Sequence, residues 1–283
     1  MWYCLNVARQ ITYVTLADGR RQERRLPLTF RLLLPLLHNL NPIVSQPVFT
    51  KTSEQGEKKL ISAGFEGLLN GREFAAMKIA FPLVFGTAWL LVLRLLTHIL
   101  PTISENFLLL LICGIALLYF YPVFWLRQAV AIRHRSIQRA LPFVLDLLTL
   151  AVEAGLDFMT ALQRNTDRRR LDPLNEELIR MIREIQLGTP RRVALRNMSQ
   201  RVDLADLRSV TYALIQADEL GVSIGAILRI QSDQLRQRRF DRAEKLAHEA
   251  PVKMLAPLML FIFPAVFIVL LGPILSGVVV NLF

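Results

Sequence analysis

The stretch FLLLLICGIALLYFYPVFWL, residues 107–126, contains no charged side chain and is long enough to cross a lipid bilayer. A spanning helix needs about 20 apolar residues, because each residue adds about 1.5 Å along the helix axis. Two other stretches meet the same requirement: IAFPLVFGTAWLLVLRLLT at 79–97, and residues 254–283, which lack Asp, Glu, Lys and Arg. The sequence therefore predicts an integral membrane protein with three spans.

Basic residues are distributed unevenly along the 283-residue chain, whose formal net charge is +11. Of the 34 lysines and arginines, 22 lie in 127–253, and none lies in 98–126 or 254–283. Lysine and arginine mark the cytoplasmic side of a membrane protein. We therefore expect the N-terminus and residues 127–253 to be cytoplasmic, and the C-terminus to lie on the opposite side.

Spans and loops together predict seven segments. They are an N-terminal cytoplasmic region (1–75), a first transmembrane helix (76–97), an outer loop (98–106), a second transmembrane helix (107–126), a cytoplasmic helical bundle (127–252), a third transmembrane helix (253–275) and an outer tail (276–283). In the first segment, residues 26–40 carry apolar side chains at helical spacing beside Arg31. This pattern fits an interfacial helix on the inner leaflet or a cytosolic helix that packs on the bundle.

Residues 127–252 have the periodicity of helices, and no strand pattern competes with it. Asp157 is expected to cap one helix. Asp172 followed by Pro173 is expected to begin the next, and Asp203 with Asp206 to cap a later one. Glu176 and Arg180 are spaced for an ion pair along one helix. Four glycines are expected to form turns between helices: Gly155, Gly188, Gly221 and Gly225. The predicted fold class is all-α, with three transmembrane helices and a cytoplasmic six-helix bundle.

A repeat within the bundle singles out two glutamates. Residues 151–162 read AVEAGLDFMTAL and residues 217–228 read ADELGVSIGAIL, which share A-x-E-x-G and indicate a duplicated helix–turn–helix hairpin. Glu153 and Glu219 fall in the last turn of their helices, where the helix dipole disfavours negative charge. Either each glutamate forms a salt bridge with an arginine of the bundle, or it contacts a partner protein. We take both as candidate partner-binding residues.

No pattern in the chain predicts catalysis. Nucleotide-binding, hydrolase and metalloprotease motifs are absent from the sequence, and the four histidines lack metal-ligand spacing. We therefore predict no enzyme activity, no catalytic residue, no cofactor and no metal. The arginine clusters at 168–170 and 236–239 have only Phe240 as an aromatic neighbour, so nucleic-acid binding is not expected. Lipid contact or an acidic protein partner fits these clusters better.

Three segments of the chain form a recognisable pattern: LPFVLDLLTLAVEAGLDFMTAL from Leu141, IQLGTPRRVALRNMSQR, and the run from ADELGVSIGAIL through the third span. Together they resemble the type II secretion F domain. The lead-in KKLISAGFEGLLNGREFAAMKIAFPLVFG is similar to that of TadC-like proteins of tight-adherence (Flp) pilus systems. The resemblance covers about residues 58–275 and places the A-x-E-x-G and E-L-G-x-S-I-G elements of the family at Ala151–Gly155 and Glu219–Gly225.

This resemblance implies an inner-membrane platform protein of a type II secretion or type IVb (Flp) pilus assembly machine. It implies a multi-pass protein of the bacterial inner membrane, with the N-terminus cytoplasmic and the C-terminus periplasmic. The expected partners are a secretion ATPase, pilin subunits, the lipid bilayer, and a sister F-domain (TadB-like) protein or a second copy of the chain. That last partner is implied because classical platform proteins carry two bundles and this chain carries one. The alternative is a small polytopic membrane transporter or channel subunit, which would need polar residues within its spans.

Overall fold

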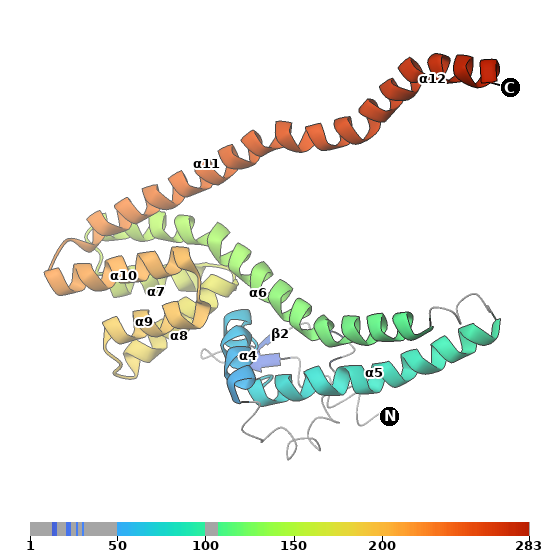
Figure 1. Cartoon of the computed structure of the whole chain (residues 1–283). Helices are drawn as coiled ribbons and strands as arrows, with labels where there is room; N and C mark the ends of the chain where they lie inside the picture. Colours follow the sequence, from blue (N-terminus) through green and yellow to red (C-terminus); the bar gives the residue numbers. More distant parts are fainter. Residues whose placement is uncertain are drawn as a thin grey trace. The chain divides into compact units, whose positions relative to one another are not determined.

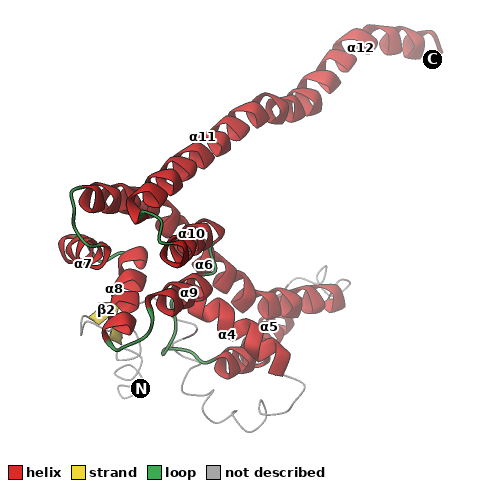
Figure 2. Ribbon diagram, turned by 90° about the vertical axis from the view of Figure 1, so that its left-hand side faces the viewer, coloured by secondary structure: helices red, strands yellow, loops and turns green. Residues whose placement is uncertain are grey.

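The computed structural model describes residues 13–15, 21–23, 27, 30, 50–99 and 107–282 (Figure 1). The chain divides into two compact units, Met1–Arg229 and Ile230–Phe283, which are described separately below. Helices dominate both units (Figure 2). This confirms the predicted all-α fold class.

The first unit begins with a short antiparallel pair of strands, β1 (Tyr13–Thr15) and β2 (Arg21–Glu23), in which Val14 is paired with Gln22. Its helices are α4 (Thr50–Ala63), α5 (Gly71–Ile99), α6 (Phe107–Glu153), α7 (Phe158–Arg168), α8 (Pro173–Gln186), α9 (Arg191–Val202) and α10 (Ala205–Leu220). Helix α11 (Ile224–Pro257) begins in this unit and continues into the second. The strand pair was not predicted, because residues 1–25 show no clear periodicity.

Three helical stretches in the described part of the chain are long and apolar enough to cross a membrane: Gly71–Thr97, Phe107–Glu153 and Ile224–Pro273. They overlap the three spans predicted from the sequence. The second stretch extends well beyond its predicted span, because α6 runs for 47 residues without a break at residue 127. Residues 127–137 contain neither glycine nor proline, the two residues that most often end a helix. The second span and the first helix of the bundle are therefore one helix.

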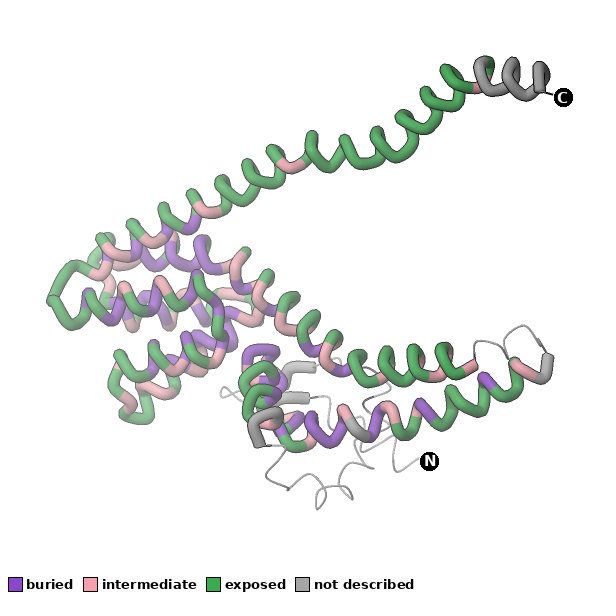
Figure 3. Tube along the Cα trace, in the orientation of Figure 1, coloured by how far each residue is buried: buried purple, intermediate pink, exposed green. Residues whose placement is uncertain are grey.

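Helices α5 and α6 pack closely within the predicted membrane region. The Trp89 indole nitrogen donates a hydrogen bond to the Leu110 carbonyl oxygen at 3.4 Å. A Cβ atom at Gly114 would lie only 2.1 Å from that nitrogen, so the indole occupies the space that a side chain would need. Small residues allow such close approach of spanning helices. Both helices also carry exposed large apolar residues, as lipid-facing helices do, and much of each helix in this region is coloured as exposed in Figure 3.

The N-terminal part of the first unit packs around one aromatic cluster. Phe30 is fully buried, with ring centroids 5.8 Å from Phe81, 6.2 Å from Tyr121 and 4.7 Å from Trp125. Phe30 therefore contacts α5 and α6. Apart from Pro27 and Phe30, the helix predicted at 26–40 lies outside the described residues. Helix α4 begins at Thr50.

Between residues 127 and 252, all of which are described, the chain forms the six predicted helical segments. The apolar stripes of α6 to α10 meet in a core whose most buried members include Ile137, Leu162, Leu174, Met181, Leu195 and Leu207. Two predicted caps are present: Asp157 accepts from the Met159 amide at 2.9 Å, and Asp172 from the Asn175 amide at 2.7 Å. Periodicity and capping residues thus placed most of these helices correctly.

The predicted cap at Asp203 and Asp206 is wrong. Asp203 ends α9 in the left-handed conformation with φ 51°, and Leu204 is the residue that precedes α10. Asp206 is buried and accepts a hydrogen bond from the Gln138 side chain of α6 at 3.1 Å. The two helices are separated by so few residues that Asp203 must reverse the chain direction. The Asp206 carboxylate is instead engaged in the tertiary contact with Gln138.

The second unit contains most of α11, a π-helical turn η4 (Leu258–Ile262) and α12 (Phe263–Leu282). Pro257 directly precedes η4. Proline cannot donate a backbone hydrogen bond and displaces the preceding turn, which favours a local change of helix type. Large apolar residues from Met254 to Leu271 are exposed throughout (Figure 3). This surface is the one expected of a helix surrounded by lipid.

Candidate functional site

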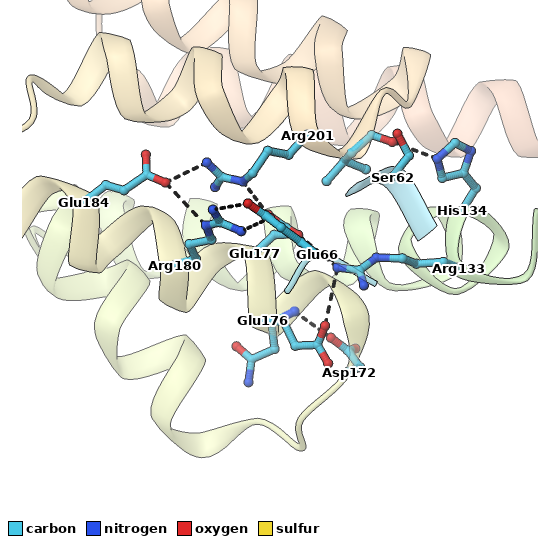
Figure 4. A network of polar contacts seen from close by, with 12 residues as sticks. Ser62, Glu66, Arg133, His134, Asp172, Glu176, Glu177, Arg180, Glu184 and Arg201 are labelled. Carbon is cyan, nitrogen blue, oxygen red and sulfur yellow. Dashed lines mark hydrogen bonds and ion pairs between the residues drawn. The ribbon is translucent and has the colours of Figure 1, made fainter. Parts of the chain in front are cut away.

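Charged residues from three helices come together inside the first unit (Figure 4). Arg133 of α6 is 5% exposed, and its Nη2 lies 2.9 Å from Glu177 Oε1 and 3.4 Å from Glu176 Oε2 of α8. Glu177 also accepts from Arg201 Nε of α9 at 3.0 Å. One buried carboxylate therefore joins two arginines that come from different helices.

This chain of charges continues toward the surface. Arg201 Nη1 lies 2.6 Å from Glu184 Oε1, and Arg180 Nε lies 3.7 Å from the same oxygen. Arg180 also donates two hydrogen bonds to Glu66, one of them 3.1 Å long, in the turn between α4 and α5. The hydrogen bond from Arg180 lowers the pKa of the Glu66 carboxyl and raises the pKa of the guanidinium. We call this set of residues the charged network: Glu66, Arg133, Glu176, Glu177, Arg180, Glu184 and Arg201.

The predicted ion pair between Glu176 and Arg180 along α8 is wrong. Glu176 instead lies against Arg133, and Arg180 against Glu66 and Glu184. A buried charge without a partner is costly, so the guanidinium brought in by α6 determines where Glu176 points. The sequence does hold one signal for this arrangement. Glu177 falls at a position of the apolar stripe between Leu174 and Met181, where a carboxylate requires a buried partner.

The charged network lies close to the ends of the predicted spans. Arg133 follows Leu126 by seven residues in α6, or roughly 10 Å along the axis. Glu66 lies shortly before Gly71, where α5 begins. His134 adds a further contact, because its Nε2 donates to the Val202 carbonyl oxygen at 2.7 Å at the end of α9. The network therefore connects α8 and α9 to α6 and to the turn that precedes α5, two of the helices that contain predicted spans.

Ion pairs account for the carboxylates of the charged network. The carboxylates are engaged by arginines, and no cluster of potential metal ligands occurs among the described residues. Removing one partner of a buried ion pair costs about 3–5 kcal/mol, although the intact pair adds little net stability. The arrangement fixes the geometry of the helices relative to one another.

Glu153 and Glu219, the candidate partner-binding residues, both lie at the surface of the bundle. Glu153 is 3.1 Å from Arg229 of α11, and Glu219 is 3.3 Å from Arg192 of α9. Each glutamate thus has an arginine neighbour within the bundle, as one of the two hypotheses expected. Such exposed pairs contribute about 0–1 kcal/mol. Contact with a partner protein stays a prediction.

The predicted glycine turns differ at one position. Gly155, Gly188 and Gly221 have φ values of 90°, 96° and 67°, a conformation in which only glycine avoids strain. Gly225 lies in the first turn of α11, so the turn predicted there is wrong. A Cβ at Gly225 would lie 3.5 Å from a Val152 methyl carbon. This residue marks a contact between α11 and the end of α6.

Comparison with known proteins gives one match. Residues 144–272 match the model of the family described as Type II secretion system (T2SS), protein F. The match begins within α6, includes α7 to α10, and extends through α11 into α12. No curated protein and no solved structure matches the chain. The T2SSF domain and the three apolar helices fit a multi-pass protein of the inner membrane related to type II secretion and type IV pili.

Proposed function

We propose that this protein is an inner-membrane platform protein of a type II secretion or type IVb (Flp, tight-adherence) pilus assembly machine. In this proposal it couples a cytoplasmic secretion ATPase to the assembly or export of pilins. The observation that carries the proposal is the T2SSF match on a helical bundle whose first helix continues from a candidate transmembrane helix. Family members of this kind are membrane platform proteins and not enzymes.

Helix α6 is the feature best suited to such coupling. Its 47 residues correspond to roughly 70 Å, and it contains both the second predicted span and a wall of the bundle core. The charged network fixes α8 and α9 to α6 through Arg133, and to the start of α5 through Glu66. A displacement of α8 and α9 by an ATPase would therefore move two predicted membrane helices.

Membrane orientation is part of the proposal. We place the N-terminus and the bundle in the cytoplasm, and residues 98–106 and 276–283 in the periplasm. Alkaline phosphatase is active only when it is exported. A fusion after Phe283 should therefore be active and a fusion after Gln200 inactive. The opposite pattern would refute the orientation.

The partners follow from the same proposal. A single F domain favours pairing with a sister F-domain (TadB-like) protein or with a second copy of this chain. We propose Glu153 and Glu219 as contacts to the ATPase or the sister protein, because both are half-exposed and near a turn of the duplicated hairpin.

The alternative function, a small membrane transporter or channel subunit, gains no support. Residues 107–126 carry no charge, and Arg94 is the one charged residue in 79–97.

Deletion of the gene in the source bacterium tests the proposal directly. We expect the loss of surface pili or of a secreted pilin-like protein, and restoration by the wild-type chain. The affinity-tagged full-length protein, extracted in detergent, should retain a secretion ATPase. Normal pilus and secretion levels in the deletion strain would contradict the proposed function.

A further inference from the structure

A groove of about 670 Å³ opens beside the turn that joins α6 to α7. Its apolar side is formed by Phe143, Leu147 and Ala151, which follow one another at intervals of four residues along α6. Its basic side is formed by Arg164 and by the cluster at 168–170. We call this feature the α6–α7 groove.

The apolar side of the groove is exposed although it belongs to a cytoplasmic bundle in the proposed topology. Phe143 is 59% exposed and Leu147 is 40% exposed, whereas their neighbour Leu145 is buried in the core. Exposed apolar surface of this kind marks an interaction site. The stripe from Phe143 to Ala151 extends about 12 Å, which is the length of two turns of a partner helix.

Most of the arginines on the basic side of the groove are not neutralised by nearby carboxylates of the described residues. Arg164, Arg168 and Arg170 are exposed, and no carboxylate in the described part of the chain pairs with them. Asp172 is the one carboxylate among the residues that line the groove, and it is already engaged by Arg169 and by the amide of Asn175. A ligand with several carboxylates would complement this surface, because arginine binds carboxylates through paired hydrogen bonds.

The position of the groove favours a protein over a lipid surface. Phe143 follows Leu126 by seventeen residues in α6, or roughly 25 Å along the helix axis. The polar layer on each side of a bilayer is only about 5–8 Å thick, and the electrostatic attraction of lipid headgroups decays within about 8 Å. Along α6, the groove is therefore separated from the predicted span by more than the thickness of that polar layer.

We propose that the α6–α7 groove binds an acidic amphipathic helix of a partner protein. The apolar face of that helix would lie on Phe143, Leu147 and Ala151. Carboxylates along one edge would pair with Arg164, Arg168 and Arg170. This inference rests on the groove and on the proposed membrane topology, and it holds whether or not the proposed platform function is correct.

The test uses the full-length chain in phosphatidylcholine nanodiscs and a fluorescent synthetic helix of about 18 residues, or five turns. The probe carries leucine at helical spacing and glutamate at its flanks, and a control probe carries lysine in place of glutamate. By fluorescence anisotropy, we expect the glutamate probe to bind at least tenfold more tightly. Either Arg164→Glu with Arg168→Glu, or Phe143→Ser alone, should weaken its binding about tenfold.

Matched variants on α11 separate this site from general electrostatic attraction. Arg239→Glu with Arg242→Glu makes the same change of charge, and Phe240→Ser removes another exposed ring. These variants should bind the glutamate probe like the wild type. Equal weakening by both arginine pairs would overturn the proposal. It would also be overturned if phosphatidylglycerol vesicles bound in a groove-dependent manner while the glutamate probe did not.

Discussion

Glu177→Gln is the most direct perturbation of the charged network. The substitution keeps the size of the side chain but removes the charge that Arg133 and Arg201 share. Loss of one partner of a buried ion pair costs about 3–5 kcal/mol. Arg133 retains Glu176 at 3.4 Å, and Arg201 retains Glu184 at 2.6 Å. We therefore expect a loss at or below the lower limit of that range, about 2–3 kcal/mol of unfolding free energy.

Thermal unfolding of the detergent-solubilised chain, followed by circular dichroism at 222 nm, measures this loss. A change of 1 kcal/mol shifts Tm by about 2–4 °C in a large domain, so Glu177→Gln should lower Tm by roughly 4–12 °C. Glu219→Gln is the matched control, because its partner Arg192 is exposed and the pair contributes about 0–1 kcal/mol. An equal shift for both variants, or no shift for Glu177→Gln, would refute the importance of burial in this network.

Three further predictions concern other parts of the molecule. Gly114→Ala should destabilise the α5–α6 pair by about 1–3 kcal/mol, because the new Cβ would meet the Trp89 ring. Adding Trp89→Leu should restore Tm in the same thermal assay, and failure of this rescue would contradict the contact. Glu66→Gln should lower Tm at pH 7, and the difference from wild type should shrink as pH falls below 4.5, the ordinary pKa of the carboxyl. Arg180 lowers the pKa of Glu66 in the folded state, so the Glu66 carboxylate stabilises the fold above pH 4.5, and this stability is lost as the folded carboxyl is protonated. A pH-independent difference in Tm would contradict this prediction. Glu219→Gln should reduce both pilus assembly and ATPase capture at unchanged Tm, and a lowered Tm with capture intact would instead assign Glu219 to internal support.

The sequence by itself determined the features that depend on local physical chemistry. Hydropathy located the three candidate spans, and the 3.6-residue period located the helices of the bundle. Asp157 and Asp172 were identified as caps, since a capping bond involves residues only two or three positions apart. The turns at Gly155 and Gly221 were predictable for the same reason, because a left-handed conformation favours glycine wherever it occurs.

Only the tertiary structure decided which side chains meet across helices. Arg133 and Glu177 are 44 positions apart, and no local rule pairs them. The local rules failed where such contacts compete with them. Glu176 contacts Arg133 and not Arg180, and Asp206 contacts Gln138 and does not cap a helix. The energy of a buried charge depends on every group that surrounds it, and those groups are brought together only when the helices pack.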